Sequence, residues 1–167
     1  MNLRSFETMT VCFPVKGDHV LLSVKTRDIG KGCWNGYGGK VKPRETRREA
    51  AVRELAEESG LIAHLGALHE MGFMDFRNTD ESGQETRVRM YIYLVYLVHS
   101  WDGEPRESAE MVTPTFFPCN RLPLDAMMPA DRIWLPHVLT GRKIRGKAVY
   151  GPGQKTLIGE VEIIKLA

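Results

Sequence analysis

Three glutamates, Glu54, Glu57 and Glu58, are spaced so that a helix would bring their side chains together. They stand at positions i, i+3 and i+4, which are neighbours on a helix surface. Like charges this close repel, and a face that is merely solvated would alternate Glu with Lys. Three converging carboxylates therefore indicate a hard divalent cation, Mg²⁺ or Mn²⁺, bound through oxygen atoms. For a Glu-rich string in isolation, the alternative is an exposed, solvated helix.

The residues around these glutamates make the pattern specific. The stretch fits the signature G-x5-E-x7-R-E-U-x-E-E-x-G-U, where U is a bulky apolar residue, at every defined position. A match of this length is far more specific than a lone glycine motif. The chain therefore resembles the Nudix hydrolases. The resemblance implies an α/β/α sandwich and metal-dependent hydrolysis of a nucleoside diphosphate linked to another group. The matching residues are Gly39, Glu45, Arg53, Glu54, Leu55, Glu57, Glu58, Gly60 and Leu61.

The metal set would serve the attack of water on a pyrophosphate. That group carries dense negative charge, so hydrolysis needs cations on its oxygens and a metal that makes water more acidic. Gly39 has no side chain, so its carbonyl can approach such a metal closely. The general base is expected to be Glu57 or Glu58. Glu110, in "ESAEM" before an expected strand, is a further candidate for base or ligand, with a solvated loop residue as the alternative. The expected ligands are Gly39, Glu54, Glu57, Glu58 and Glu110.

Arg53 joins the catalytic set in a supporting role. Glu57 and Glu49 each lie one helical turn from it, and Glu45 lies at the entrance to the helix. A guanidinium shared among carboxylates would orient the glutamates rather than touch substrate.

Segments outside the signature resemble the MutT-type members of the family, which hydrolyse oxidised purine nucleoside triphosphates such as 8-oxo-dGTP. The likeness lies in "GKGCWNGYGGKV", "SAEM", "FF" and "MMPADRIWLP", and it runs from about Thr10 to Ile163. It implies that Asn35 hydrogen-bonds the base, and an amide with donors and an acceptor suits a purine edge. A turn residue before Gly36 is the alternative for Asn35, and core packing is the alternative for the aromatic residues. The implied substrate-binding set is Thr10, Lys25, Ile29, Asn35, Phe73, Met90, Met128, Asp131 and Trp134.

One part of this expected pocket departs from the MutT-type pattern. The chain has Met128, Pro129, Ala130 and Asp131 where the resembled enzymes have an aromatic residue, Pro and two aspartates that read the purine edge. One carboxyl is here a methyl, so we expect altered discrimination among oxidised purines. Met128 also replaces a rigid stacking face with a flexible one, which predicts broader tolerance of bases.

The implied reaction converts a purine nucleoside triphosphate to the monophosphate and pyrophosphate, a role in nucleotide-pool sanitation. One alternative within the family is hydrolysis of dinucleoside polyphosphates, or of triphosphorylated or capped RNA ends. The basic segment 141–155, which includes Tyr150, would favour RNA, although it also fits a solvated turn. Hydrolysis of a nucleotide sugar or another small diphosphate is a further reading. A nucleotide-binding regulatory module is disfavoured, because every glutamate of the signature is present.

The elements that must position these residues can be predicted from local patterns. Residues 8–25 form two apolar runs around "KGD", which predicts a hairpin, and a glycine-rich loop follows. Residues 46–59 predict a helix, with a capping box at Thr46 and Glu49 and a stop at Gly60. Further elements are a central strand at 87–100, shorter strands at 111–119 and 155–166, a hairpin tip at 78–86, and a short helix at 131–139 interrupted by Pro136.

The order of these elements predicts an α+β fold with a mixed sheet, because the helices are too few to cover a fully parallel one. The chain of 167 residues, 43% of them hydrophobic, predicts one domain over 1–167. The net charge of +2 does not by itself argue for a nucleic-acid or membrane partner. We expect a small-molecule nucleotide substrate, no nucleic-acid partner and a monomer. Three separated cysteines and the lack of a long apolar run predict reduced thiols, no membrane association and a cytoplasmic location.

Overall fold

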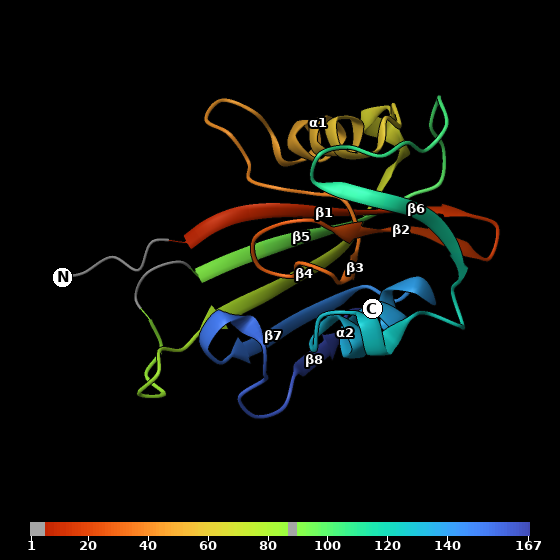
Figure 1. Ribbon diagram of the computed structural model, residues 1–167. Helices are drawn as coiled ribbons and strands as arrows, with labels where there is room; N and C mark the ends of the chain where they lie inside the picture. Colours follow the sequence, from red (N-terminus) through yellow and green to blue (C-terminus); the bar gives the residue numbers. More distant parts are fainter. Residues whose placement is uncertain (1–5, 87–89) are drawn as a thin grey trace.

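A mixed β-sheet with one helix on each broad face forms the molecule (Figure 1). This computed structural model describes residues 6–86 and 90–167. The strands are ordered β3-β2-β1-β5-β4-β7-β8, and β6 pairs with β2. The pairs β1–β5 and β4–β7 are parallel and the others are antiparallel. The predicted α/β/α sandwich with a mixed sheet is therefore confirmed.

The strands and helices have the following bounds. The strands are β1 (Phe6–Lys16), β2 (His19–Lys25), β3 (Trp34–Asn35), β4 (Leu68–Asn78), β5 (Met90–Val98), β6 (Met111–Pro118), β7 (Ile144–Tyr150) and β8 (Glu162–Lys165). The helices are α1 (Arg47–Ser59) and α2 (Asp131–Leu139), with short 3-10 helices at Leu65–Ala67, Leu124–Ala126 and Pro152–Gln154.

The expected hairpin and central strand are both present. β1 and β2 pair around a turn at Gly17, whose φ of 61° suits a residue without a Cβ. β5 lies between β1 and β4, in the middle of the sheet. The first three positions of the expected strand at 87–100 lie outside the described residues.

Helix α1 begins and ends where local signals predicted. Thr46 caps the helix by accepting the N–H of Glu49 at 3.1 Å, and the Glu49 carboxylate accepts the N–H of Thr46 at 2.7 Å. Glu49 therefore serves the cap and is not a partner of Arg53. Gly60 ends the helix with a φ of 77°.

The C-terminal part of the sheet differs from the sequence-based expectation. Part of the basic segment 141–155 forms β7, parallel to β4, rather than a solvated turn. Its buried and less buried positions alternate, with Ile144, Ala148 and Tyr150 in the α2-face cluster and Arg145 and Lys147 at the positions between them. β8 covers only Glu162–Lys165 of the strand expected at 155–166. Gly159, with a φ of 73°, stands in that run and interrupts its extended backbone.

Helix α2 runs through Pro136 rather than being interrupted by it. Proline removes one N–H from the helical ladder. The buried Trp134, Leu135 and Val138 attach the helix to the sheet, and this packing outweighs the lost hydrogen bond.

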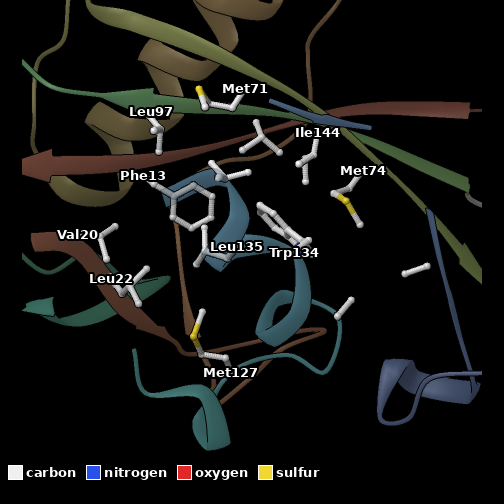
Figure 2. Packing of buried hydrophobic residues seen from close by; sticks show 14 of the residues in the cluster. Phe13, Val20, Leu22, Met71, Met74, Leu97, Met127, Trp134, Leu135 and Ile144 are labelled. Carbon is white, nitrogen blue, oxygen red and sulfur yellow. The ribbon is translucent and has the colours of Figure 1, made fainter. Parts of the chain in front are cut away.

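Two apolar clusters lie on opposite faces of the sheet. Figure 2 shows the cluster on the α2 face, where Phe13 meets the edge of Trp134 at 5.8 Å between ring centroids. The α1-face cluster includes Leu55 of the helix and Cys12 of β1. Phe13, the next residue along β1, belongs to the α2-face cluster. This alternation is the two-residue period of a strand covered on both faces. Within the described part of the chain, no helix is long and apolar enough to cross a membrane.

Candidate active site

Arg53, in the middle of α1, contacts a carboxylate before the helix and two on the helix itself. Its guanidinium donates to both carboxylate oxygens of Glu45, at 2.9 and 2.7 Å, and to Glu54 at 2.7 Å. It also reaches Glu57 at 3.3 Å and the carbonyl of Lys40 at 3.1 Å. The bidentate contact with Arg53 lowers the pKa of Glu45 to about 2. Arg53 therefore contacts Glu45, Glu54 and Glu57 at once.

Glu58 is the most deeply buried of the three signature glutamates on α1. Its side chain is held by the N–H of Gly38 at 3.0 Å, and the residue is only 8% exposed. The pKa of Glu58 is raised to about 8, chiefly by burial and also by the nearby carboxylates of Glu54 and Glu110, while the Gly38 N–H and Lys25 oppose the shift. The Glu58 carboxyl therefore favours its protonated form at neutral pH.

Gly39 leaves the space that the Glu54 carboxylate occupies. A Cβ at Gly39 would lie 2.6 Å from the Oε1 atom of Glu54, so any larger residue would displace that group. The Gly39 carbonyl accepts the N–H of Thr10 at 2.8 Å and, more weakly, the Thr10 hydroxyl at 3.5 Å. Glu54, Glu58 and the Gly39 carbonyl offer only oxygen atoms, the donors that Mg²⁺ and Mn²⁺ prefer.

The other carboxylates expected to bind the metal are held by arginines in this structure. Arg53 binds Glu54 and Glu57, and Arg27 forms an ion pair with Glu110. Over residues 6–86 and 90–167, no three His, Cys, Asp or Glu side chains are grouped as metal ligands. The residues present fit a divalent cation in charge and donor type. To bind it, Glu54, Glu57 and Glu110 would give up their ion pairs with the arginines and contact the ion instead.

A pocket of about 930 Å³ opens on the α2 face of the sheet. Six of the expected substrate residues line it, namely Lys25, Ile29, Asn35, Met128, Asp131 and Trp134.

Two expected lining residues lie elsewhere. Thr10 is fully buried on the opposite face of β1, where its backbone and hydroxyl contact the Gly39 carbonyl. Phe73 packs against the α1-face cluster, with the guanidinium of Arg145 5.5 Å from its ring centroid. The side chain of Met90 lies outside the described residues.

Several lining residues were not identified from the sequence. Tyr150, at the end of β7, is in the pocket wall although its segment was read as a turn. The two-residue period of a strand could have predicted the lining residues of β1. Because neighbouring strand residues point to opposite faces, Met9 and Val11 must face the side opposite to Thr10. The missed residues include Met9, Val11, Cys33, Phe76, Tyr93, Met127 and Tyr150.

Asn35 and Asp131 are two of the polar groups in a wall that combines apolar and aromatic side chains with charged ones such as Lys25 and Arg132. A Cβ on Gly30 would lie 3.3 Å from Asn35 Nδ2 and 3.4 Å from Met128 Sδ, so these two side chains converge around that glycine. Asp131 Oδ1 accepts the Trp134 Nε1–H at 2.9 Å. Burial raises the pKa of Asp131 to about 7, and the Trp134 hydrogen bond opposes that shift. Its carboxyl can therefore accept or donate a hydrogen bond near neutral pH.

Lys25 connects the pocket with the carboxylates. It lines the pocket, and its charge is close enough to Glu58 to lower the pKa of that carboxyl. Its ammonium donates to the Ile29 carbonyl at 2.7 Å. A ligand with an aromatic end in the pocket and an anionic end beside Lys25 would thus extend toward the glutamates.

Comparison with known proteins gives the family. The NUDIX domain profile matches residues 7–138. The chain is 36% identical, over 138 residues and 83% of each chain, to the oxidized purine nucleoside triphosphate hydrolase of Danio rerio. It is also 36% identical, over 137 residues and 82% of each chain, to the enzyme of that name from Mus musculus. A mutator MutT protein of Bacillus halodurans superposes with a TM-score of 0.80 at 26% identity, covering 94% of this chain and 97% of that one. The chain is therefore a hydrolase of the NUDIX family.

Proposed function

We propose that this hydrolase converts purine nucleoside triphosphates to nucleoside monophosphate and pyrophosphate, with oxidised purines such as 8-oxo-dGTP as the leading substrates. The observation that carries the proposal is the connection, through Lys25, between an aromatic-lined pocket and the buried Glu58 carboxyl. A pocket of about 930 Å³ lies in the usual size range of small-molecule sites. The two relatives from Danio rerio and Mus musculus, which match over more than four fifths of each chain, are named for hydrolysis of oxidised purine nucleoside triphosphates.

Nudix hydrolases generally need divalent metal ions, and we assign Mg²⁺ or Mn²⁺ to this one. Glu54, Glu57 and Glu58 would hold the ion, with the Gly39 carbonyl and Glu110 as further donors. When bound, it would neutralise phosphate oxygens and acidify the attacking water. Glu57, whose side chain is 55% exposed, can accept a proton from water, whereas Glu58 is enclosed.

The remaining residues of the proposed mechanism bind and orient. Arg53 would keep Glu54 and Glu57 from repelling one another before the ion arrives. Asn35 and Asp131 would hydrogen-bond the base, and Met128 and Trp134 would contact its face and edge.

The setting of the enzyme is also part of the proposal. We assign it a small-molecule substrate, a monomeric state and a cytoplasmic location. The unpaired Cys12, Cys33 and Cys119 support a reducing compartment. Light scattering after size exclusion tests the monomer.

Pyrophosphate release with Mg²⁺ tests the substrate directly. The panel is 8-oxo-dGTP, 2-oxo-dATP, dGTP, diadenosine tetraphosphate and a triphosphorylated RNA. We expect kcat/KM to be highest for an oxidised purine, and Glu57→Gln to remove the activity. Glu104→Gln, which changes an exposed loop carboxylate, should behave as the wild type. Turnover of the dinucleotide or the RNA without turnover of the free triphosphates would contradict the proposal.

A further inference from the structure

Tyr150 places a phenol in the wall of the pocket. It is the last residue of β7, it is 2% exposed, and it lines the cavity together with Asp131. Its ring packs on Phe76 at 5.9 Å between centroids. Phe76, Tyr93 and Trp134 line the same pocket, so Tyr150 stands among aromatic side chains that can contact a planar base.

Among the residues that the structure describes, the hydroxyl of Tyr150 accepts one hydrogen bond and does not donate one. Its oxygen accepts the N–H of Ala130 at 3.0 Å. A phenol also has a proton to donate. Within residues 6–86 and 90–167, the only hydrogen bond found for the Tyr150 hydroxyl is the one from the Ala130 N–H, and none from its proton to an acceptor is found. A buried donor without an acceptor is costly, and a ligand in the pocket can remove that cost.

The neighbours of this hydroxyl place it at the polar edge of the pocket. Burial raises the pKa of Tyr150, and the charges of Asp131 and Cys33 raise it further, which requires both groups to be near. The phenol therefore stays protonated and able to donate. Both Asp131 and Cys33 line the pocket, so the hydroxyl belongs to the same part of its wall.

We propose that Tyr150 is a specificity-determining residue whose hydroxyl donates a hydrogen bond to an acceptor atom on the edge of the purine, beside Asp131. This inference rests on the proposed function, because it takes a purine nucleotide as the ligand. The same oxygen would still accept the Ala130 N–H, so the loop before α2 and the base would share one hydroxyl.

Substrate analogues and one conservative variant test the role. The substrates are 8-oxo-dGTP and dGTP, with the triphosphates of 2-aminopurine, which lacks the 6-oxygen, and 7-deazaguanine, which lacks the ring nitrogen N7. With the wild type, the analogue that lacks the contacted acceptor atom should have a kcat/KM about tenfold lower than its parent, mainly because its KM is higher. In Tyr150→Phe the parent and that analogue should be hydrolysed equally well.

A purely structural role gives a different result. Tyr150→Phe also leaves the Ala130 N–H without its acceptor, and a displaced loop would lower kcat/KM for every substrate by the same factor. The matched control is Tyr96→Phe, which changes a buried tyrosine of the α1-face cluster. It should leave the ratios between substrates as in the wild type.

The outcomes separate this inference from the proposed function. Turnover of the purine triphosphates, with substrate ratios unchanged in Tyr150→Phe, overturns the role of Tyr150 and leaves the proposed function intact. A uniform loss over all substrates also overturns it. If the wild type hydrolyses no purine triphosphate, the proposed function fails and the inference fails with it.

Discussion

At the scale of single residues, the contact between Gly39 and Glu54 is the sharpest geometric constraint on the carboxylates. The backbone of Gly39 is not in the left-handed region, so alanine is acceptable there in conformational terms. The obstacle is the Glu54 carboxyl group, which a Cβ would meet at 2.6 Å. A substitution at Gly39 should therefore affect the site more than the fold.

Gly39→Ala is predicted to weaken metal activation. Displacing the Glu54 carboxylate should raise the Mg²⁺ concentration for half-maximal activity by roughly 10-fold or more, as changes beside metal ligands do. The measurement is a Mg²⁺ titration of activity, with the melting temperature as a check on folding. Gly66→Ala is the matched control, because no atom lies within 4 Å of its added Cβ. Equal Mg²⁺ dependence in the two variants would refute the prediction.

Asp131 is predicted to make stability depend on pH. Its pKa is about 7 in the folded protein, against an ordinary value of 3.8, so the native state keeps a proton that the unfolded chain has lost. The free energy of unfolding should therefore fall as pH rises from about 4 to 7. This loss of stability is complete once the pH is above the folded pKa.

Asp131→Asn removes this titration and keeps an oxygen for the Trp134 Nε1–H. Its stability should decline less between pH 5 and 8 than that of the wild type. Urea denaturation at several pH values measures the difference between the two curves. Parallel curves would show that the buried carboxyl does not titrate in this range.

Residues close in the sequence were easier to predict than residues brought together by the sheet. The carboxylate set lies almost entirely within 39–61, and helix spacing alone places three of its glutamates together. The pocket draws on distant segments. Phe73 was expected there, but Phe76 lines it, because a register shift in β4 between Glu70 and Phe73 changes which residues face each side.

At the scale of elements, the cap of α1 holds the beginning of the glutamate helix. Thr46→Ala should lower the free energy of unfolding by about 1 kcal/mol, because it removes the acceptor of the Glu49 N–H. Urea denaturation measures the loss. Thr46→Ser keeps the hydroxyl and should remain close to the wild type. If serine and alanine destabilise the protein equally, the hydroxyl is not the stabilising group.

The same local chemistry explains which elements were predictable. The N-cap and the terminal glycine of α1 are short-range signals, and both are present as expected. β7 was missed because charged residues and Gly146 interrupt the apolar character of its alternation. Gly146 is required by packing, since a Cβ there would lie 2.2 Å from Met74 Sδ. Such a contact depends on a strand that is distant in the sequence.

At the scale of the whole molecule, two cores share one sheet and should unfold together. Leu55 on α1 and Leu135 on α2 are both fully buried, one in each cluster. Leu55→Ala and Leu135→Ala should each cost about 2–5 kcal/mol. Tryptophan fluorescence and far-UV circular dichroism should give one coincident transition for each variant. Separate transitions in Leu135→Ala would show that the α2 face unfolds independently.

Strand β1 serves both faces of the sheet with alternate residues. Met9 and Val11 line the pocket, whereas Thr10 braces the Gly39 loop and Cys12 belongs to the cluster under α1. Selection can therefore act on the two faces separately. If the proposed function holds, base preference can drift among descendants of this chain through changes at every second position, while the carboxylates of α1 and the Gly39 loop are inherited unaltered.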